Sequence, residues 1–526
     1  MINLLTIFIV TIIILWFVSE IKNLLFWIYL WQLKNYHIGR FKDHFTTKKG
    51  RNIFINPLYI LKLLSLFLFL ISLKSPYLLL VGFLLTFLII LDGVLSIYKI
   101  IGKKIQYPVF TKKIIFLFIV NIFSILAILK LSNVNPDFFL PFLAELILIN
   151  VLTPLIVSTI VLTFQPITVL LRLITLNKAI NKRKSLKNLT VIGITGSYGK
   201  SSTKEFLYTI LSSKYKGVKK TPENFNSEMG ISNFILSGLN EKDKYFICEM
   251  GAYNRGGIKL LCKIADPQIG ILTGINNQHL STFGTQENIV KAKFELIDYV
   301  KDFAVINWDN YLIKNQKLPS KTIYKYSYLD KQDIYAENIK VFRDHIEFNA
   351  CLLNGEKEYF KVNVLGLQNV SNLLGAIMVA YKLGMSLKEI SEAAKEIKAE
   401  EGGMTMIKNF IDATYSSNAN GVMAHLNFLK LWTGKKVIVM PCLIELGAES
   451  KRIHEEIGKK IHEVCDLAII TTEDHFKELK KEGKEKIVFE NNPDKISEIL
   501  KEFDNKEDII LLESRVPSRV INSIKK

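Results

Sequence analysis

Cysteine is scarce in this sequence, and its few copies are far apart. The chain of 526 residues contains five, and no two of them form a CxxC pair. They are Cys248, Cys262, Cys351, Cys442 and Cys465. This spacing argues against a disulfide framework and against a zinc ribbon.

Acidic residues are scarce in the first third of the chain. Residues 1–190 contain 5 of the 49 Asp and Glu residues but 21 of the 68 Lys and Arg residues, so +16 of the formal net charge of +19 lies here. The other residues are nearly balanced at +3. Because the basic excess accompanies apolar sequence, we expect no nucleic-acid partner. A hydrophobic content of 49% also argues against intrinsic disorder.

Long apolar runs fill the same third, and most approach or reach the ~20 residues with which a helix crosses a bilayer. The runs lie at about 2–18, 58–73, 77–97, 113–131 and 138–163. We therefore predict five membrane spans. The first has no basic n-region and no small-residue cleavage site before Glu20, so we expect an anchor and not a signal peptide. The aromatic segment 23–33 is predicted to lie at the interface or to extend the first helix.

Basic residues collect in alternate connections between these runs. Segments 34–57 and 98–113 are rich in Lys and Arg, as is the sequence that follows the last run, whereas 74–76 has one lysine and 132–137 has no basic residue. By the positive-inside rule the basic segments are cytoplasmic. This predicts a multi-pass protein of the cell membrane with its N-terminus outside and everything after about residue 165 in the cytoplasm.

Two acidic residues fall within predicted spans, where an ionisable group is a functional hypothesis. Asp92 lies near the cytoplasmic end of its span and could simply reach the interface. Glu145 lies deeper, and it is the better candidate for contact with a polar headgroup or a partner helix.

A phosphate-binding loop is indicated just after residue 189. The segment TVIGIT at 190–195 is typical of a short buried strand, GSYGKSS follows it, and TKEFLYTILSSKY is helix-like. In such a loop, backbone N–H groups and the helix N-terminus bind anionic oxygens. Lys200 is predicted to neutralise the β- and γ-phosphates, and Ser201 to bind Mg²⁺. The predicted nucleotide-binding residues are Thr195, Gly196, Ser197, Tyr198, Gly199, Lys200, Ser201 and Ser202.

Two more residues are predicted at the same edge of the sheet. Glu249 ends the apolar strand KYFICE, and His279 follows the strand IGILTGI. The carboxyl ends of parallel strands form the ligand-binding edge of an α/β sheet. Glu249 is therefore a candidate second ligand of Mg²⁺, although it could equally be an ordinary strand-end carboxylate.

The order of these motifs resembles the Mur ligases. The similarity rests on GITGSYGKSSTKEFL, TPENFNSEMGI, EMGAYNRGGI, HLSTFG, KAKFELI, NWDN, LGLQNVSNLLGA and LIELGAES, and it covers about residues 190–526. Within that family the chain is most similar to the type that adds D-alanyl-D-alanine to a peptidoglycan precursor. The resemblance implies ATP and Mg²⁺ as cofactors, and ATP-dependent formation of an amide bond through an acyl phosphate. The expected partners are the precursor peptide and an amino acid or dipeptide.

The resemblance also implies roles for individual residues. Lys200 would bind the β- and γ-phosphates, Ser201 and Glu249 one Mg²⁺, and His279 a second Mg²⁺, supported by Lys293 as a carbamate. The positions around adenine and ribose would be Asn307, Asp309 and Asn369, and the substrate-facing loop would contain Thr221, Asn224, Asn226 and Ser227.

The sequence departs from the family at two positions of interest. Gly403 stands where relatives usually have an arginine, and Ala413 stands where the second residue of an Asp-Asp pair is common. A nucleotide-binding membrane pseudoenzyme is therefore kept as an alternative. Another alternative is a different ATP-dependent carboxylate–amine ligase, acting on a lipid-linked or polyglutamate-type substrate.

The predicted fold is a multi-pass α-helical membrane domain followed by two α/β domains. The membrane domain covers 1–187, a P-loop ATPase-like central domain 188–399, and a smaller doubly wound, Rossmann-like domain 400–526. Short antiparallel strands are expected between 318 and 365, and His454 on an exposed helix face. Nothing in 1–188 resembles the UDP-binding domain of soluble relatives. Either the acceptor is lipid-linked and the basic loops contact lipid headgroups, or the spans only tether the ligase.

Overall fold

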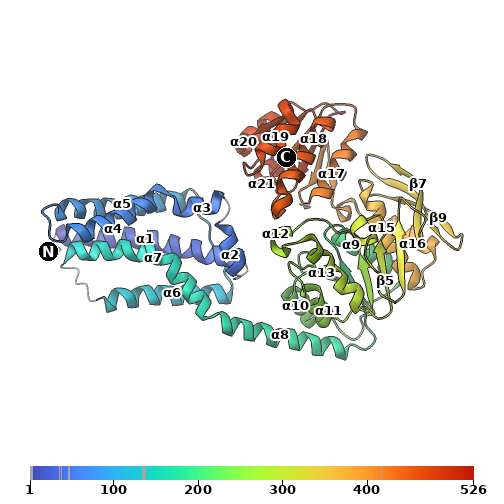
Figure 1. Ribbon diagram of the computed structural model, residues 1–526, viewed down its shortest axis with the longest axis horizontal. Helices are drawn as coiled ribbons and strands as arrows, with labels where there is room; N and C mark the ends of the chain where they lie inside the picture. The colour runs from blue at the N-terminus through green and yellow to red at the C-terminus, as the bar shows by residue number, and fades with distance from the viewer. Residues whose placement is uncertain are drawn as a thin grey trace. The chain divides into compact units, whose positions relative to one another are not determined.

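The computed structural model describes residues 4–34, 36, 38–45, 48–132, 138–415 and 418–525. The chain divides into two units, residues 1–171 and 172–526 (Figure 1). Sequence reasoning expected the division at 187/188. The difference lies in helix α8, Gln165–Ser185, whose later turns belong to the second unit, since Leu176 and Ala179 are buried in one of its core clusters.

The first unit is a bundle of helices. Its long helices are α1 (Leu4–Leu33), α4 (Pro57–Ser72), α5 (Leu78–Ile101), α6 (Lys112–Leu131) and α7 (Phe139–Thr163), and its short ones are α2 (Ile38–His44) and α3 (Lys48–Phe54). By length and composition, α1, α5, α6 and α7 could cross a membrane. The other predicted span corresponds to α4, which has 16 residues and is shorter than these four. The aromatic segment 23–33 extends the first helix, as one of the two expectations had it.

A buried polar network joins four helices of this bundle. Lys62 of α4 forms an ion pair with Asp92 of α5, and its Nζ also donates to Oδ1 of Asn150 in α7 at 2.6 Å. The Asn150 amide donates to Oε2 of Glu20 in α1 at 2.8 Å. Asp92 is 6% exposed, so it does not reach out of the bundle as its position in the sequence suggested. Both carboxylate oxygens of Glu145 are buried without a hydrogen-bond partner among the described residues.

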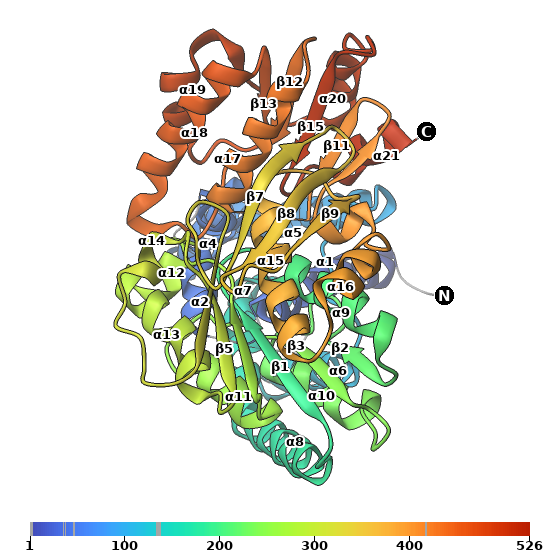
Figure 2. The ribbon, with the colours of Figure 1, turned by 90° about the vertical axis from the view of Figure 1, so that its right-hand side faces the viewer.

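The second unit contains a sheet of nine strands in the order β2-β3-β1-β4-β5-β6-β7-β8-β9. The strands are β1 (Thr190–Thr195), β2 (Val218–Lys220), β3 (Tyr245–Glu249), β4 (Ile269–Leu272), β5 (Phe303–Asn307), β6 (Ile323–Ser327), β7 (Ile334–Val341), β8 (Ile346–Leu352) and β9 (Lys357–Val362). They are parallel from β2 to β7, whereas β7, β8 and β9 pair antiparallel (Figure 2). Antiparallel strands were expected throughout 318–365, which is wrong for β6, because it pairs parallel with both β5 and β7. The antiparallel strands β7, β8 and β9 extend the parallel sheet at its edge.

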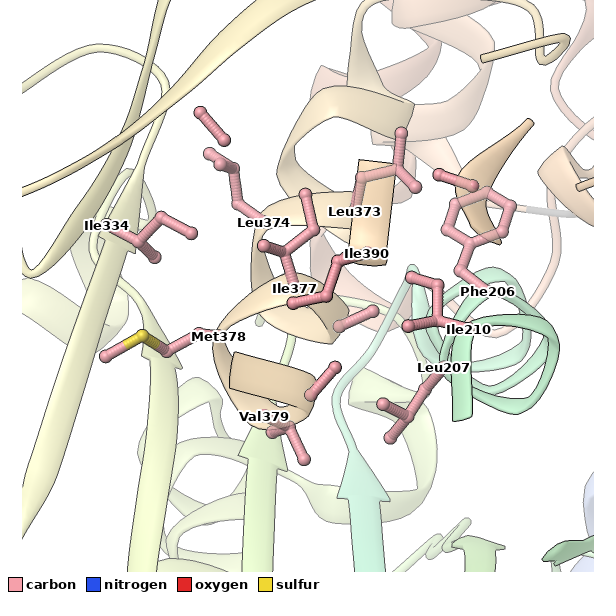
Figure 3. Packing of buried hydrophobic residues seen from close by; sticks show 14 of the residues in the cluster. Phe206, Leu207, Ile210, Ile334, Leu373, Leu374, Ile377, Met378, Val379 and Ile390 are labelled. Carbon is pink, nitrogen blue, oxygen red and sulfur yellow. The ribbon is translucent and has the colours of Figure 1, made fainter. Parts of the chain in front are cut away.

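Helices cover this sheet and fix the phosphate loop. They are α9 (Lys200–Lys214), α10 (Glu228–Gly238), α11 (Gly257–Ala265), α12 (Leu280–Phe283), α13 (Gln286–Tyr299), α14 (Tyr311–Lys314), α15 (Gln368–Lys382) and α16 (Leu387–Ala394). Phe206 and Ile210 of α9 share one buried cluster with Leu373 and Ile377 of α15 and with Ile390 of α16 (Figure 3). Because all five side chains are fully buried, α9 and the loop before it have little freedom to move.

The C-terminal part is a second, smaller α/β domain. Its sheet has the order β10-β11-β15-β12-β13-β14, with strands β10 (Thr405–Ile407), β11 (Phe410–Ala413), β12 (Lys436–Met440), β13 (Leu467–Ile470), β14 (Ile487–Phe489) and β15 (Ile509–Glu513). Its helices are α17 (Ala419–Phe428), α18 (Ser450–Val464), α19 (Phe476–Gly483), α20 (Pro493–Leu500) and α21 (Ser518–Lys525). The α/β class predicted for both domains is confirmed.

The expectation for His454 is wrong. This residue is fully buried in α18, where its Nε2 accepts a hydrogen bond from the backbone N–H of Leu443 at 3.0 Å. Its Nδ1 lies 2.6 Å from the carbonyl oxygen of Ser450. Both ring nitrogens thus serve the packing of the domain.

Candidate active site

The phosphate loop connects β1 to α9. Gly199 has a φ of 81° in the left-handed region, and a Cβ there would lie 2.4 Å from Oδ1 of Asn372. Glycine is therefore required both by conformation and by space. The Nζ of Lys200 donates to the carbonyl oxygens of Gly196 at 2.8 Å and of Ser197 at 3.3 Å. The ammonium group is thus held over the loop whose N–H groups and helix N-terminus favour an anion.

Glu249 lies directly beside this loop, as its strand position predicted. Its carboxylate accepts from Oγ of Ser201 at 3.0 Å and from the amide of Asn226 at 3.1 Å, and it pairs with Nζ of Lys204 at 3.2 Å. Burial alone would raise the pKa of Glu249. The charges of Lys200 and Lys204 and these hydrogen bonds outweigh burial and hold the pKa below its usual value, so the carboxylate stays ionised.

Two of the four residues predicted for the substrate-facing loop contact Glu249. The Oγ1 of the buried Thr221 accepts from the backbone N–H of Glu249 at 3.0 Å, and Asn226 donates to its side chain. Ser227 instead caps α10 by accepting from the N–H of Gly230 at 3.3 Å. Asn224 is exposed and has a φ of 65°. The loop therefore fixes the backbone of Glu249 through Thr221 and its carboxylate through Asn226.

His279 contacts the C-terminal domain. Its Nδ1 pairs closely with Oε2 of Glu445, and the ring of Tyr253 packs on its imidazole at 4.8 Å between ring centroids. His279 and Glu445 both adopt left-handed backbone conformations, with φ of 64° and 65°. Among the described residues, no three His, Cys, Asp or Glu side chains are grouped so as to hold a metal ion. His279 is therefore not part of a carboxylate cluster with Glu249.

Lys293 of α13 is a buried lysine at this end of the sheet. It is 3% exposed. Burial first, and then the charge of Lys200, lower the pKa of Lys293 to about 7. Near neutral pH much of this side chain is an uncharged amine, which is the form that reacts with CO₂.

The three residues predicted around adenine and ribose lie at the ends of β5 and α15. Asn307 donates to Oγ of Ser371 at 3.2 Å. The carboxylate of Asp309 accepts from Oγ of Ser327 and from the backbone N–H groups of Tyr328 and Leu329. The amide of Asn369 donates to the carbonyl oxygens of Leu365 at 2.9 Å and of Gly402 at 3.0 Å. In this structure Asp309 and Asn369 thus tie together the loops that surround a cavity.

This cavity has a volume of about 670 Å³ and lies between the central sheet and the C-terminal domain. Residues 197–202 of the phosphate loop line it, as do Asn307, Asp309 and Asn369. The predicted residues Thr195 and Gly196 do not line it, nor do Glu249, His279 and Lys293. The C-terminal domain contributes Tyr415, residues 418–421, Met423, Ala424, His425, Leu446, Arg452, Ile453 and Glu456.

Sequence reasoning missed three residues of this site. Lys204 is 1% exposed and neutralises Glu249. Its position one helical turn after Lys200 places it on the same helix face, and this spacing could have predicted it. Asn310 donates to the hydroxyl of Tyr198 at 3.0 Å and to the carbonyl of Ile275 at 2.8 Å. Arg452 reaches the cavity from α18, and no local pattern in the sequence indicated that.

The two departures from the family pattern have different surroundings. Gly403 lines the cavity with a φ of 82°, and a Cβ there would meet only Oγ of Ser202, at 3.8 Å. Ala413 is fully buried in the core of the C-terminal domain and does not line the cavity. Ser416 and Ser417, which follow shortly after Ala413 in the sequence, lie outside the described residues.

The donors beside the phosphate loop suit a magnesium ion. Mg²⁺ prefers oxygen ligands, keeps several waters and is bound through few protein groups plus phosphate oxygens. The Ser201 hydroxyl and the ionised Glu249 carboxylate provide two such oxygens within 3.0 Å of each other. These residues fit one Mg²⁺.

The chain is similar in sequence to Mur ligases. Residues 194–380 match the Mur ligase middle domain. The UDP-N-acetylmuramoyl-tripeptide–D-alanyl-D-alanine ligase of Bacillus subtilis is 27% identical over 281 residues, which are 52% of this chain and 60% of that protein. The corresponding ligase of Borreliella burgdorferi is 31% identical over 276 residues, 51% of this chain and 58% of that protein. The matched part of the chain thus spans about 60% of the length of these relatives.

Solved structures share this fold. MurF from Acinetobacter baumannii superposes with a TM-score of 0.60 at 24% identity, covering 68% of this chain and 81% of that one. The MurF ligase from Thermotoga maritima in complex with ADP gives a TM-score of 0.59 at 25% identity, with 66% and 83% covered.

Proposed function

We propose that the chain is an ATP-dependent ligase that forms an amide bond in peptidoglycan-precursor synthesis, because residues 194–380 match the Mur ligase middle domain. The observation that carries this proposal is the pairing of Ser201 and Glu249 beside Lys200, at the edge of a cavity between two α/β domains. The names of the relatives supply the substrates that we propose. The acceptor is the carboxylate of a UDP-N-acetylmuramoyl-tripeptide, and the donor is D-alanyl-D-alanine.

The proposed reaction has two steps. A carboxylate oxygen of the acceptor attacks the γ-phosphorus of ATP, the bond from that phosphorus to the β–γ bridging oxygen breaks, and ADP leaves. The amine of the dipeptide then attacks the acyl carbon, the bond to the phosphate oxygen breaks, and phosphate leaves as the amine loses a proton. No covalent bond to the protein is needed, so the protein acts by positioning and charge neutralisation.

The residues beside the loop have distinct roles in this scheme. Lys200 breaks its hydrogen bonds to the carbonyl oxygens of Gly196 and Ser197 and binds the β- and γ-phosphates. Ser201 and Glu249 would hold Mg²⁺, which neutralises phosphate charge when bound. Asn226 and Lys204 fix the Glu249 carboxylate, and Thr221 fixes the backbone of Glu249. Asn307, Asp309 and Asn369 shape the part of the cavity proposed for adenine and ribose.

Lys293 is proposed to be carbamylated. Its neutral amine adds to CO₂ and loses a proton, which converts a cationic side chain into an anion. The lowered pKa of Lys293 supports this step, because only the uncharged amine is nucleophilic. Such an anion would support a second Mg²⁺ near His279, which requires His279 to exchange its partner Glu445.

The first unit is proposed to lie in the cell membrane. Four helices are long and apolar enough to cross it. We count α4 as a fifth crossing, because it packs in the same buried cluster and pairs with α5 through Lys62 and Asp92. Five crossings and the basic connections put the N-terminus outside and the ligase domains in the cytoplasm. The spans would then keep the ligase next to lipid and to lipid-linked precursors.

Acceptor-dependent phosphate release tests the proposed activity. Purified full-length protein is given ATP, Mg²⁺, D-alanyl-D-alanine and either the UDP-linked or the undecaprenyl-linked precursor. Wild type is compared with Lys200→Ala and Glu249→Ala, for which we expect losses of at least about 100-fold. Lys242→Ala is the matched control, because Lys242 is exposed and does not line the cavity.

The outcomes separate the alternatives. ATP binding without acceptor-dependent phosphate release would favour the pseudoenzyme. Release with the undecaprenyl-linked acceptor alone would make the lipid-linked precursor the substrate, and equal use of both acceptors would remove that idea.

A further inference from the structure

One lysine and one arginine line the cavity among the residues that the structure describes, and they come from opposite domains. One is Lys200 of the phosphate loop. The other is Arg452, which lies in the first turns of α18 in the C-terminal domain. The proposed function uses Lys200 and gives no role to Arg452.

The negative charges at the cavity favour a second cation there. The phosphate chain of a nucleoside triphosphate carries several negative charges, and Asp309 and Glu456 add carboxylates to the lining. Lys204 lies close to the loop, but it is committed to Glu249 and Glu205. At Gly403 the wall has no side chain at all. On the side of the C-terminal domain, the guanidinium of Arg452 is therefore the available group.

We propose that Arg452 binds the phosphate chain of the nucleotide and is the phosphate-binding residue of the C-terminal domain. This inference rests on the nucleotide site of the proposed function. A planar guanidinium presents several N–H donors in a fork that matches two phosphate oxygens at once, which a lysine ammonium cannot do. The contact would also link nucleotide binding to the position of the C-terminal domain.

The present partners of Arg452 allow this exchange. Its Nε and Nη2 donate to Glu449 at 2.8 and 2.5 Å, and its Nη1 donates to Glu456 at 2.5 Å. The arginine side chain is 54% exposed, and both glutamates are also partly exposed. Exposed pairs between residues three or four apart on a helix contribute little to stability. The two carboxylates therefore hold the guanidinium at the cavity and release it readily to phosphate.

Nucleotide binding to full-length protein in detergent tests the inference directly. Affinities for ATP, ADP and adenosine are measured by calorimetry, without acceptor or donor, for wild type, Arg452→Ala, Arg452→Lys and Lys451→Ala. Lys451 is the matched control, because it is the exposed neighbour on the same helix and does not line the cavity.

We expect Arg452→Ala to weaken ATP binding by about 10- to 100-fold, the range for hydrogen bonds to a charged group. Adenosine should bind as to wild type, Arg452→Lys should recover part of the loss, and Lys451→Ala should have no effect. Unchanged ATP affinity in Arg452→Ala, or an equal loss for adenosine, would overturn the inference.

The measurement does not depend on ligase turnover. If wild type bound ATP but formed no amide bond, the proposed function would fail while the role of Arg452 stood. If wild type bound no ATP, both would fail.

Discussion

Glutamine in place of Glu249 is expected to destabilise the second unit chiefly through Lys204. The Nζ of Lys204 lies 3.2 Å from Oε2 of Glu249, and the lysine side chain is 1% exposed. Glutamine keeps the shape of the side chain and an acceptor for Asn226, but it removes the charge. The ammonium group then keeps only Glu205, at 3.3 Å.

The size of the effect follows from this burial. Removing one partner of a buried ion pair costs about 3–5 kcal/mol, because the other charge stays buried without compensation. Since Glu205 remains as a second partner, we expect the lower end, about 3 kcal/mol. For a unit of this size, ~2 °C per kcal/mol converts that loss into a fall of about 6 °C in Tm.

Thermal unfolding in detergent checks the prediction with two further variants. Lys204→Met combined with Glu249→Gln removes both charges and should regain most of the lost Tm, although Glu249 is still missing for Mg²⁺ and ligase activity should stay low. Glu205→Gln should cost much less, because the Glu205 side chain is 22% exposed. A double variant no more stable than Glu249→Gln would refute the argument that an uncompensated Lys204 causes the loss.

Two other predictions concern Lys293 and Gly403. Because the pKa of Lys293 is lowered to about 7, its amine is neutral above that pH and protonated below it. A carbamate signal in ¹³C NMR with labelled bicarbonate should therefore grow as pH rises through 7; persistence of that signal in Lys293→Met would contradict the assignment. Gly403→Ala should lower stability by about 1 kcal/mol because of its left-handed φ. The ATP affinity of Gly403→Ala, measured by titration, should stay unchanged, since the new Cβ meets only Ser202. A Tm equal to that of wild type would contradict the predicted backbone strain.

Local patterns predicted the phosphate loop and its neighbour on β3. A strand, a glycine turn and a Lys-Ser pair are contiguous, so short-range geometry sets Lys200 and Ser201 in place. Glu249 could be predicted because strands that run parallel end at one edge. For both, position in the sequence determines position in the fold.

Contacts between segments far apart in the sequence could not be predicted from local patterns. Arg452 reaches the cavity through the packing of the C-terminal domain, and His279 meets Glu445 from that same domain. His454 looked exposed because charged residues flank it, yet its ring is the acceptor for the N–H of Leu443. In each case the partner is supplied by tertiary structure, which helical or strand periodicity does not encode.

The polar network in the first unit bears on how the helices assemble. Each helix enters the bilayer separately in the membrane topology proposed above, and Lys62 of α4 would do so on a short, 16-residue helix without its partner. Its charge is neutralised only when Asp92 of α5 arrives, and Glu20 of α1 gains the hydrogen bond from the Asn150 amide only when α7 arrives. In that topology the helices therefore depend on one another after insertion, and a shortened chain that kept only α4 as its anchor would leave the charge of Lys62 without its partner in lipid.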